Sequence, residues 1–153
     1  MNFMPHWASM LVNEIPDDQF ATRLGTTINH PAFVLGHLSY YAAVAVQLLG
    51  GEVEIGENEA VLYQHGAECC DDASAYPDKQ ACIELFNARM KMAANFIATS
   101  SEETLNASAA DTPFAERFDT LGQVATFMLI AHPPFHFGQL SAWRRVAGIG
   151  PAS

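Results

Sequence analysis

Three of the six histidines, at positions 37, 132 and 136, lie on predicted helices within long segments that contain no Asp, Glu, Lys or Arg. His132 and His136 are four residues apart, so on a regular helix their imidazoles share one face, with Cβ atoms about 5 to 6 Å apart. This spacing suits a shared metal ion, and His37 on a facing helix would complete a set of three nitrogen ligands. Three protein ligands leave room on the ion for water or substrate, which is typical of a reactive metal centre.

Pro133 and Pro134 separate the two histidines near the C-terminus. Each lacks a backbone N–H, and Pro133 disfavours α geometry at His132, so we expect the helix to kink or restart there. The kink either aims His132 inward or removes it from the ligand set. A single histidine on an apolar helix face is also more often a hydrogen-bonded core residue than a ligand, which leaves a purely structural interpretation open for His37.

The residue after His132 bears on the type of reaction. A metalloprotease of the H-E-x-x-H type needs a Glu there, and this chain has Pro133. The motif therefore supplies no general base. A metal ion that binds the sulfur of a small thiol lowers the thiol pKa by itself, so the missing base matters less for thiol transfer than for hydrolysis. The pattern favours transfer of a thiol to an electrophile.

Other polar side chains near these histidines have both a functional and a structural interpretation. Gln139 could orient a ligand or pack between helices, and Tyr40 or Tyr41 could donate a proton or fill the core. Arg144 and Arg145 could attract an anionic substrate, although cations are also expected in the last turn of a helix because of its dipole. The sequence identifies no catalytic residue and no organic-cofactor motif.

Charge and cysteine content exclude several classes of protein. Seven Lys and Arg against seventeen Asp and Glu give a net charge of -10, which is the wrong sign for binding nucleic acid. Cys69, Cys70 and Cys82 form no C-x-x-C motif and are too few for a disulfide scaffold. The first basic residue is Arg23, so the positive region that begins a secretory signal is missing. We therefore expect a cytoplasmic protein with reduced thiols.

Two uncharged runs, at 24–51 and 120–143, are long enough to raise the question of a membrane span, which needs about 20 residues. Both runs carry polar residues that lipid would penalise, and the mean hydropathy of the chain is only +0.07. We interpret the runs as buried helices of a bundle, with no membrane partner.

Helical periodicity and capping signals predict four principal helices, at residues 3–14, 31–49, 78–99 and 120–146. One further helical turn is expected at 19–24. Residues 50–77 are acidic and rich in glycine, which is typical of a long surface connection with at most a short helix near 58–64. Residues 106–113 show no apolar period and are expected to be mostly loop. The sequence thus predicts an all-α four-helix bundle, as one domain over 1–153, with a long connection between the second and third helices.

Two segments of the sequence resemble those of a known family. The run NHPAFVLGHL at residues 29–38, followed by LLGG at 48–51, is similar to the second-helix signature of the DinB/YfiT-like superfamily. The run HPPFHFGQLS at 132–141, followed by Arg144 and Arg145, is similar to its last-helix signature, apart from the two prolines. The resemblance spans most of the chain in order and spacing, but only these two segments are specific.

The resemblance implies a four-helix bundle, commonly a homodimer, with a divalent metal ion held by His37, His132 and His136. Known members include transferases and isomerases that use low-molecular-weight thiols, and many members have no assigned reaction. Three imidazoles suit Zn, Ni, Cu or Fe, of which we expect Zn or Ni. The leading hypothesis is a metal-dependent thiol S-transferase acting on a small molecule. The alternatives are a stress-associated bundle that binds metal or a small molecule without turnover, and a structural dimer with core histidines.

Overall fold

The computed structural model describes residues 3–152, and within that range the chain is all-helical, with a single isolated bridge between Ser108 and Thr120. The prediction of an all-α protein is therefore confirmed. The elements, in chain order, are α1 (Phe3–Val12), η1 (Asp17–Gln19), α2 (Pro31–Leu48), α3 (Glu59–Tyr63), η2 (Ala73–Ala75), α4 (Lys79–Thr99), α5 (Glu102–Asn106), α6 (Leu121–Thr126), η3 (Phe127–Ala131) and α7 (His132–Val146).

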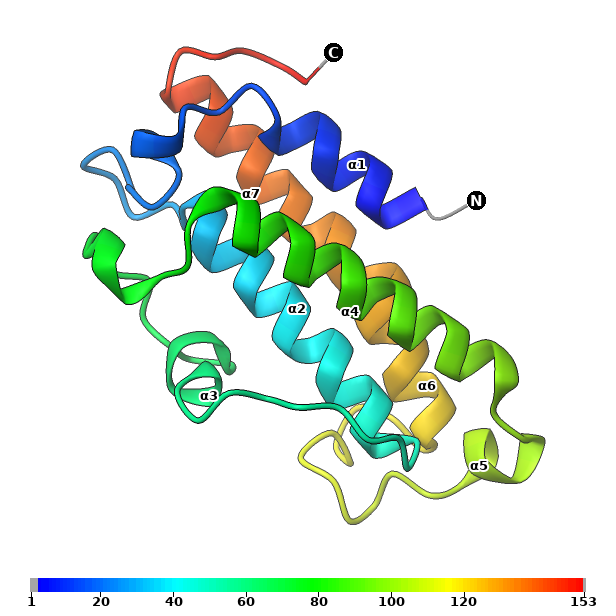
Figure 1. Cartoon of the computed structure of the whole chain (residues 1–153). Helices are drawn as coiled ribbons and strands as arrows, with labels where there is room; N and C mark the ends of the chain where they lie inside the picture. Colours follow the sequence, from blue (N-terminus) through cyan, green and yellow to red (C-terminus); the bar gives the residue numbers. More distant parts are fainter. Residues whose placement is uncertain (1–2, 153) are drawn as a thin grey trace.

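Four long helical segments lie side by side as a bundle: α1, α2, α4, and the continuous run of α6, η3 and α7 (Figure 1). The α2 helix packs along α4 and also contacts α6, η3 and α7, while α1 packs on α7 and α4. Residues of all four segments meet in one core, where the largest fully buried side chains include Trp143, Phe86, Leu35 and Val12. The short helices α3 and α5 lie outside this bundle (Figure 1).

The α2 helix is the most deeply buried element, and local signals in the sequence define its ends. His30 caps its N-terminus, because its Nδ1 accepts a hydrogen bond from the Phe33 amide at 3.1 Å, and Pro31 occupies the first turn. Gly50, with φ +83°, follows its last residues. By length and composition α2 could span a membrane, but 78% of its residues are buried inside this chain. The bundle itself thus accounts for its apolar character.

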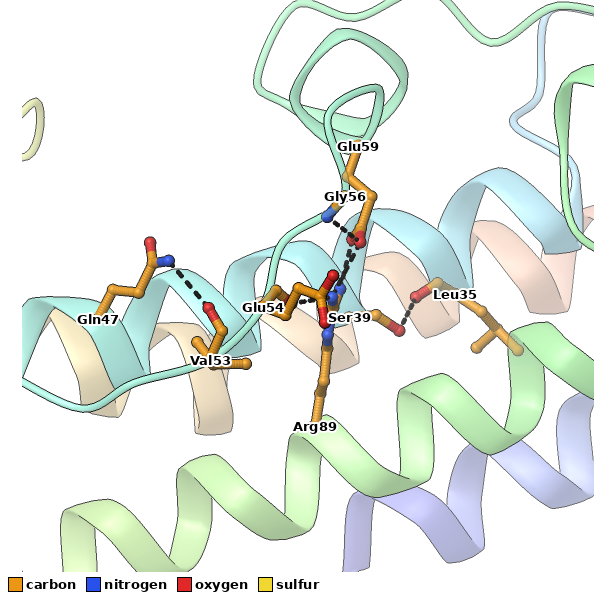
Figure 2. Close-up of polar contacts among 8 residues, drawn as sticks. All are labelled: Leu35, Ser39, Gln47, Val53, Glu54, Gly56, Glu59 and Arg89. Carbon is orange, nitrogen blue, oxygen red and sulfur yellow. Dashed lines mark hydrogen bonds and ion pairs between the residues drawn. The ribbon is translucent and has the colours of Figure 1, made fainter.

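The long connection between α2 and α4 is held against the bundle at α3. The Arg89 guanidinium, from α4, donates hydrogen bonds to both carboxylate oxygens of Glu59 and to the Glu54 carbonyl (Figure 2). At the other end of α3 the Tyr63 ring packs directly on Gly36, where a Cβ atom would lie 2.2 Å from the ring. The short helix predicted near 58–64 is confirmed, and it is fixed at both ends.

The last long segment is broken where the prolines predict a break, although the chain continues as one helical run. Thr120 and Gln123 form the predicted capping box at its start: the Thr120 hydroxyl accepts from the Gln123 amide, and the Gln123 side chain accepts from the Asp119 amide. The segment η3 is a π-helix, and α7 then restarts with both prolines in its first turn. Leu129 and Ile130 lose their usual amide partners four residues ahead, and the wider π turn accommodates this loss.

Two smaller expectations differ from the structure. The turn expected at 19–24 is wrong, because the short 3-10 helix lies earlier, at η1. The first helix ends at Val12 rather than at residue 14. The loop expected at 106–113 is confirmed except at Asn106, which is the last residue of α5; Ser101 caps that short helix by accepting a hydrogen bond from the Thr104 amide at 3.1 Å.

Candidate metal centre

The three histidines singled out by type and spacing lie together in the structure. His37 comes from the middle of α2, and His132 and His136 come from the first turns of α7. The Nε2 atom of His132 lies 3.1 Å from Nε2 of His37 and 3.0 Å from Nε2 of His136. One nitrogen from each ring lies within 4.8 Å of the other two, so the three residues are close enough to bind one metal ion.

The break at the prolines aims His132 into this cluster rather than away from it. The π turn at η3 places the amide of His132 opposite the Phe127 carbonyl, five residues back. Its ring then stacks on Phe127, with centroids 5.7 Å apart, and meets Tyr41 edge-on at 5.3 Å. The alternative in which the prolines remove His132 from the cluster is therefore wrong, because its Nε2 atom lies within 3.1 Å of Nε2 in both other rings.

Hydrogen bonds orient two of the three rings so that their lone pairs face one another. His37 Nδ1 donates to the Tyr63 carbonyl at 2.6 Å, and His136 Nδ1 donates to Gln139 Oε1 at 3.0 Å. In neutral imidazole only one nitrogen carries a proton, so Nε2 of His37 and of His136 each present a lone pair to the cluster. This is the arrangement in which a histidine binds metal through one nitrogen while an acceptor fixes the other.

Hydrogen bonds among the three rings cannot satisfy all of their nitrogen atoms, whereas a bound cation could accept the lone pairs that face one another. One proton on Nε2 of His132 could bond only one of the two lone pairs opposite, and the buried Nδ1 of His132 has no hydrogen-bond partner among residues 3–152. Tetrahedral nitrogen ligands at 2.0–2.1 Å from zinc are about 3.3 Å apart, close to the two spacings observed. The donor set and spacing therefore fit a nitrogen-binding divalent ion.

Burial keeps the three imidazoles neutral, which is the state that binds metal. Burial, with a smaller contribution from His136, lowers the pKa of His37 to about 4. Burial, together with the two neighbouring imidazoles, lowers the pKa of His132 to about 3. Burial also lowers the pKa of His136. At neutral pH no proton competes for the three nitrogens.

The cluster forms part of the wall of a cavity of about 580 Å³, a size that suits a small-molecule site. The cavity lies between α2, the chain after α3, the loop at 114–118, and the junction of η3 and α7. Among the described residues 3–152, no Asp, Glu or Lys lines it, and its single charged lining residue other than histidine is Arg117. The site is therefore accessible to a ligand but carries no carboxylate that could act as a base.

The other candidate residues divide between the site and the scaffold. Gln139 orients His136, and Tyr41 packs on His37 with centroids 4.9 Å apart while its hydroxyl accepts from the His65 amide at 2.8 Å. Arg144 is wrong as an anchor for substrate, because it is fully buried and donates to Glu14 and to the Leu11 carbonyl.

Arg145 and Tyr40 lie outside the cavity, and Arg145 donates to Ser141 on its own helix. The cysteines form no disulfide. Burial raises the pKa of Cys82 to about 12 and also raises the pKa of Cys69, so both are unreactive thiols.

Two contributions to the site were not identified from the sequence. The Tyr63 carbonyl belongs to the long connection, and only Gly36 signalled a close approach to α2. Arg117 lies in a loop without apolar period, where spacing carries no information about the site.

Comparison of the chain with protein-family models, curated proteins and solved structures finds no match. The chemistry of the three-histidine cluster is therefore the guide to function.

Proposed function

We propose that this chain is a divalent-metal-dependent enzyme of the DinB-like superfamily that transfers a small thiol to an electrophilic substrate. One observation carries the proposal: three neutral imidazoles, those of His37 and His136 buried and that of His132 half-buried, converge through their Nε2 atoms on the wall of an open cavity. A closed structural site would use four protein ligands, whereas three leave a position for a reactant.

The groups around the cluster orient the three imidazoles. Tyr63 and Gln139 hold the imidazoles of His37 and His136, and aromatic packing holds His132. A bound divalent ion would supply Lewis acidity, which lowers the pKa of a thiol or water at the vacant position. The apolar wall limits the access of water and strengthens electrostatic interactions at the site.

Thiol transfer fits the site better than hydrolysis does. Hydrolysis at this site would need a base to take a proton from water and an acid for the leaving group, and no carboxylate lines the cavity. In thiol transfer the sulfur forms the new bond, its proton passes to solvent, and the leaving group departs with the bonding electron pair. Such a step makes the least demand on protein side chains.

The resemblance to the DinB/YfiT-like superfamily supports this proposal. Its two specific segments, 29–38 and 132–141, correspond to the beginnings of α2 and α7, which carry the cluster. On the same basis we propose a homodimer with Zn or Ni as the metal. A cytoplasmic location follows from the thiol content and remains a prediction.

The second candidate is a bundle that binds metal or a small molecule without turnover. The lack of a carboxylate among the lining residues of 3–152 favours it, because a binding site needs no such base. It uses the same three histidines, so metal content alone does not separate it from the enzyme. Turnover does.

The test begins with metal content. Purified protein incubated with Zn²⁺ or Ni²⁺ and then desalted is expected to retain about one ion per chain, measured by mass spectrometry of the metal. His37→Ala should lose that ion, while His6→Ala, an exposed histidine outside the cavity, should keep it. Wild type without stoichiometric metal, or H37A with full metal, would overturn the proposal.

Turnover is then measured with the loaded protein, several low-molecular-weight thiols and a panel of aryl and alkyl electrophiles. The enzyme is expected to consume thiol at a rate that falls with chelator and with H37A. Full metal content without thiol consumption assigns the non-catalytic function instead.

A further inference from the structure

The cavity beside the cluster has an unusually uniform wall. Besides the histidines, its lining is dominated by aromatic rings, namely Phe33, Tyr41, Phe114, Phe118, Phe127 and Phe135. The Phe118 and Phe127 rings lie 5.2 Å apart, and Phe127 also stacks on His132. Flat apolar molecules pack against such rings with favourable stacking geometry.

Part of this aromatic wall is not covered by the chain itself. Phe135 is 70% exposed and Phe127 is 37% exposed, although both line the cavity. The cavity volume of about 580 Å³ matches that of drug-sized ligands. A bound molecule that covers these rings would remove apolar surface from water, which is the main source of affinity in such a site.

Arg117 differs from every other arginine in the chain. Of the five arginines, four donate side-chain hydrogen bonds within the protein: Arg23, Arg89, Arg144 and Arg145. The guanidinium of Arg117 has no hydrogen bond or ion pair within residues 3–152. Its planar, permanently charged group matches a carboxylate or a similar oxyanion.

We propose that the substrate bound in this cavity is a flat apolar anion, such as an aryl carboxylate, whose rings cover the phenylalanine wall and whose anionic group pairs with Arg117. The proposal rests on the proposed function for its chemistry, since this molecule, with a halide-type leaving group on its ring or side chain, would be the electrophile that receives the thiol. The sulfur bonds to the carbon that bears the leaving group, that group departs with the bonding electron pair, and the thiol proton passes to solvent. Among the lining side chains of residues 3–152, Arg117 is the only permanently charged one, so it is the side chain that can select ligands by charge. In a protein of net charge -10, binding an anion requires such a local cation.

The experiment compares three probes of one shape and different charge: 1-naphthoate, 1-naphthylmethanol and 1-naphthylmethylammonium. Their affinities are measured by calorimetry on Zn-loaded and on chelator-treated protein. Wild type is expected to bind 1-naphthoate about two- to fivefold more tightly than the neutral alcohol and to bind the cation most weakly, because Arg117 is exposed and one pair with an exposed cation is worth about that factor.

Matched variants assign the effect to its residues. Arg117→Gln should remove the preference for naphthoate and leave the affinity for the alcohol unchanged. Arg145→Gln makes the same charge change outside the cavity and should keep the preference. Phe135→Ala should weaken all three probes several-fold, and because this side chain is mostly exposed the variant is expected to fold normally.

Three results would overturn the proposal: equal affinities for naphthoate and the alcohol, a preference that survives in R117Q, or a preference that disappears only with the metal, which would mean that the carboxylate ligates the ion. Failure of the proposed function looks different. In that case metal does not bind stoichiometrically, while the dependence of naphthoate binding on Arg117 persists in metal-free protein.

Discussion

The orientation of His136 depends on one amide. Gln139 Oε1 accepts the Nδ1 proton of His136 at 3.0 Å, and Asn29 donates to the same oxygen at 3.5 Å. The oxygen therefore selects the tautomer of His136 and leaves its Nε2 free to bind an ion. A residue one turn beyond a ligand thus controls how that ligand presents its lone pair.

Replacing Gln139 tests this role directly. Gln139→Leu keeps the size of the side chain but removes the acceptor, so we expect the dissociation constant for Zn²⁺ to rise about 10- to 100-fold, the usual cost of losing such a partner. Gln139→Glu keeps an acceptor and should retain wild-type affinity or exceed it. Competition with a chromophoric chelator measures both values. Equal weakening in the two variants would contradict an acceptor role and indicate a packing role instead.

The low pKa values of the cluster predict how metal binding depends on pH. Because burial lowers the pKa of His37 to about 4 and that of His132 to about 3, both are neutral in the folded protein at pH 6. Three ordinary histidines with a pKa near 6.5 would together release about two protons at pH 6 on binding an ion. We expect release close to zero, measured by calorimetric titration of Zn²⁺ at pH 6 in two buffers of different ionisation enthalpy. Release of about two protons would show that the rings are protonated before binding.

At the scale of elements, the π turn and the prolines act together on one helix. His132 and His136 lie four residues apart within α7, so they share one face of that helix. The π turn at η3 changes the angular position of everything before it relative to α7, and the prolines occupy a first turn whose amides need no helical partner. The two prolines thus end the backbone hydrogen bonds of η3, and the α-helical hydrogen bonds of α7 begin after them.

A second element, α3, supports the cluster from outside the bundle. Arg89 and Glu59 pair with their side chains 7% and 18% exposed, and the same guanidinium binds the Glu54 carbonyl (Figure 2). This anchors the start of α3, whose last residue, Tyr63, accepts the Nδ1 proton of His37. An ion pair of α4 is therefore connected to the metal centre through a short helix.

Breaking that pair should affect both stability and metal binding. Arg89→Met leaves the Glu59 carboxylate buried without its partner, so we expect the free energy of unfolding to fall by about 3 kcal/mol. The dissociation constant for Zn²⁺ should rise as the Tyr63 carbonyl loses its fixed position. Denaturant unfolding and metal competition measure the two effects.

The double variant Arg89→Met with Glu59→Leu is the informative control. Replacing both charges by apolar groups should restore most of the stability, because no unpaired charge remains. Arg145→Met, on the exposed side of α7, should change the free energy of unfolding by less than about 0.5 kcal/mol. If R89M unfolds at the same denaturant concentration as wild type, the pair does not anchor α3.

At the scale of the whole molecule, local signals in the sequence predicted the long helices and the histidines that meet between them. Asp78 and Thr120 cap two of those helices through their own side chains, and caps of these residue types are visible without a structure. Pro31 marked the start of a third helix, whose cap by His30 was not predicted. The approach of Tyr63 to His37 joins positions 26 residues apart through an irregular connection, which no periodicity describes. Arg117 reaches the cavity in the same way, from a loop whose path depends on the packed bundle. Site residues that lie on helices could be predicted from their spacing, whereas those that lie on loops could not.

The place of the cluster in the bundle predicts what removing metal does to the whole molecule. The core contains side chains such as Val12, Phe86, Leu140 and Trp143, all 0% exposed, and it packs without any contribution from an ion. We therefore expect chelator-treated protein to keep its helical circular dichroism at 25 °C. Free Zn²⁺ at 100 times its dissociation constant adds about 2.7 kcal/mol of stability, which raises the Tm by roughly 5 to 10 °C for a chain of this size. His37→Ala should show no such rise in Tm, because it lacks one of the three ligands. An ion bound elsewhere would instead raise the Tm of both proteins alike. Loss of helical signal on chelation would instead make the ion part of the scaffold, and a Tm unmoved by any divalent metal would mean that the three imidazoles hold none.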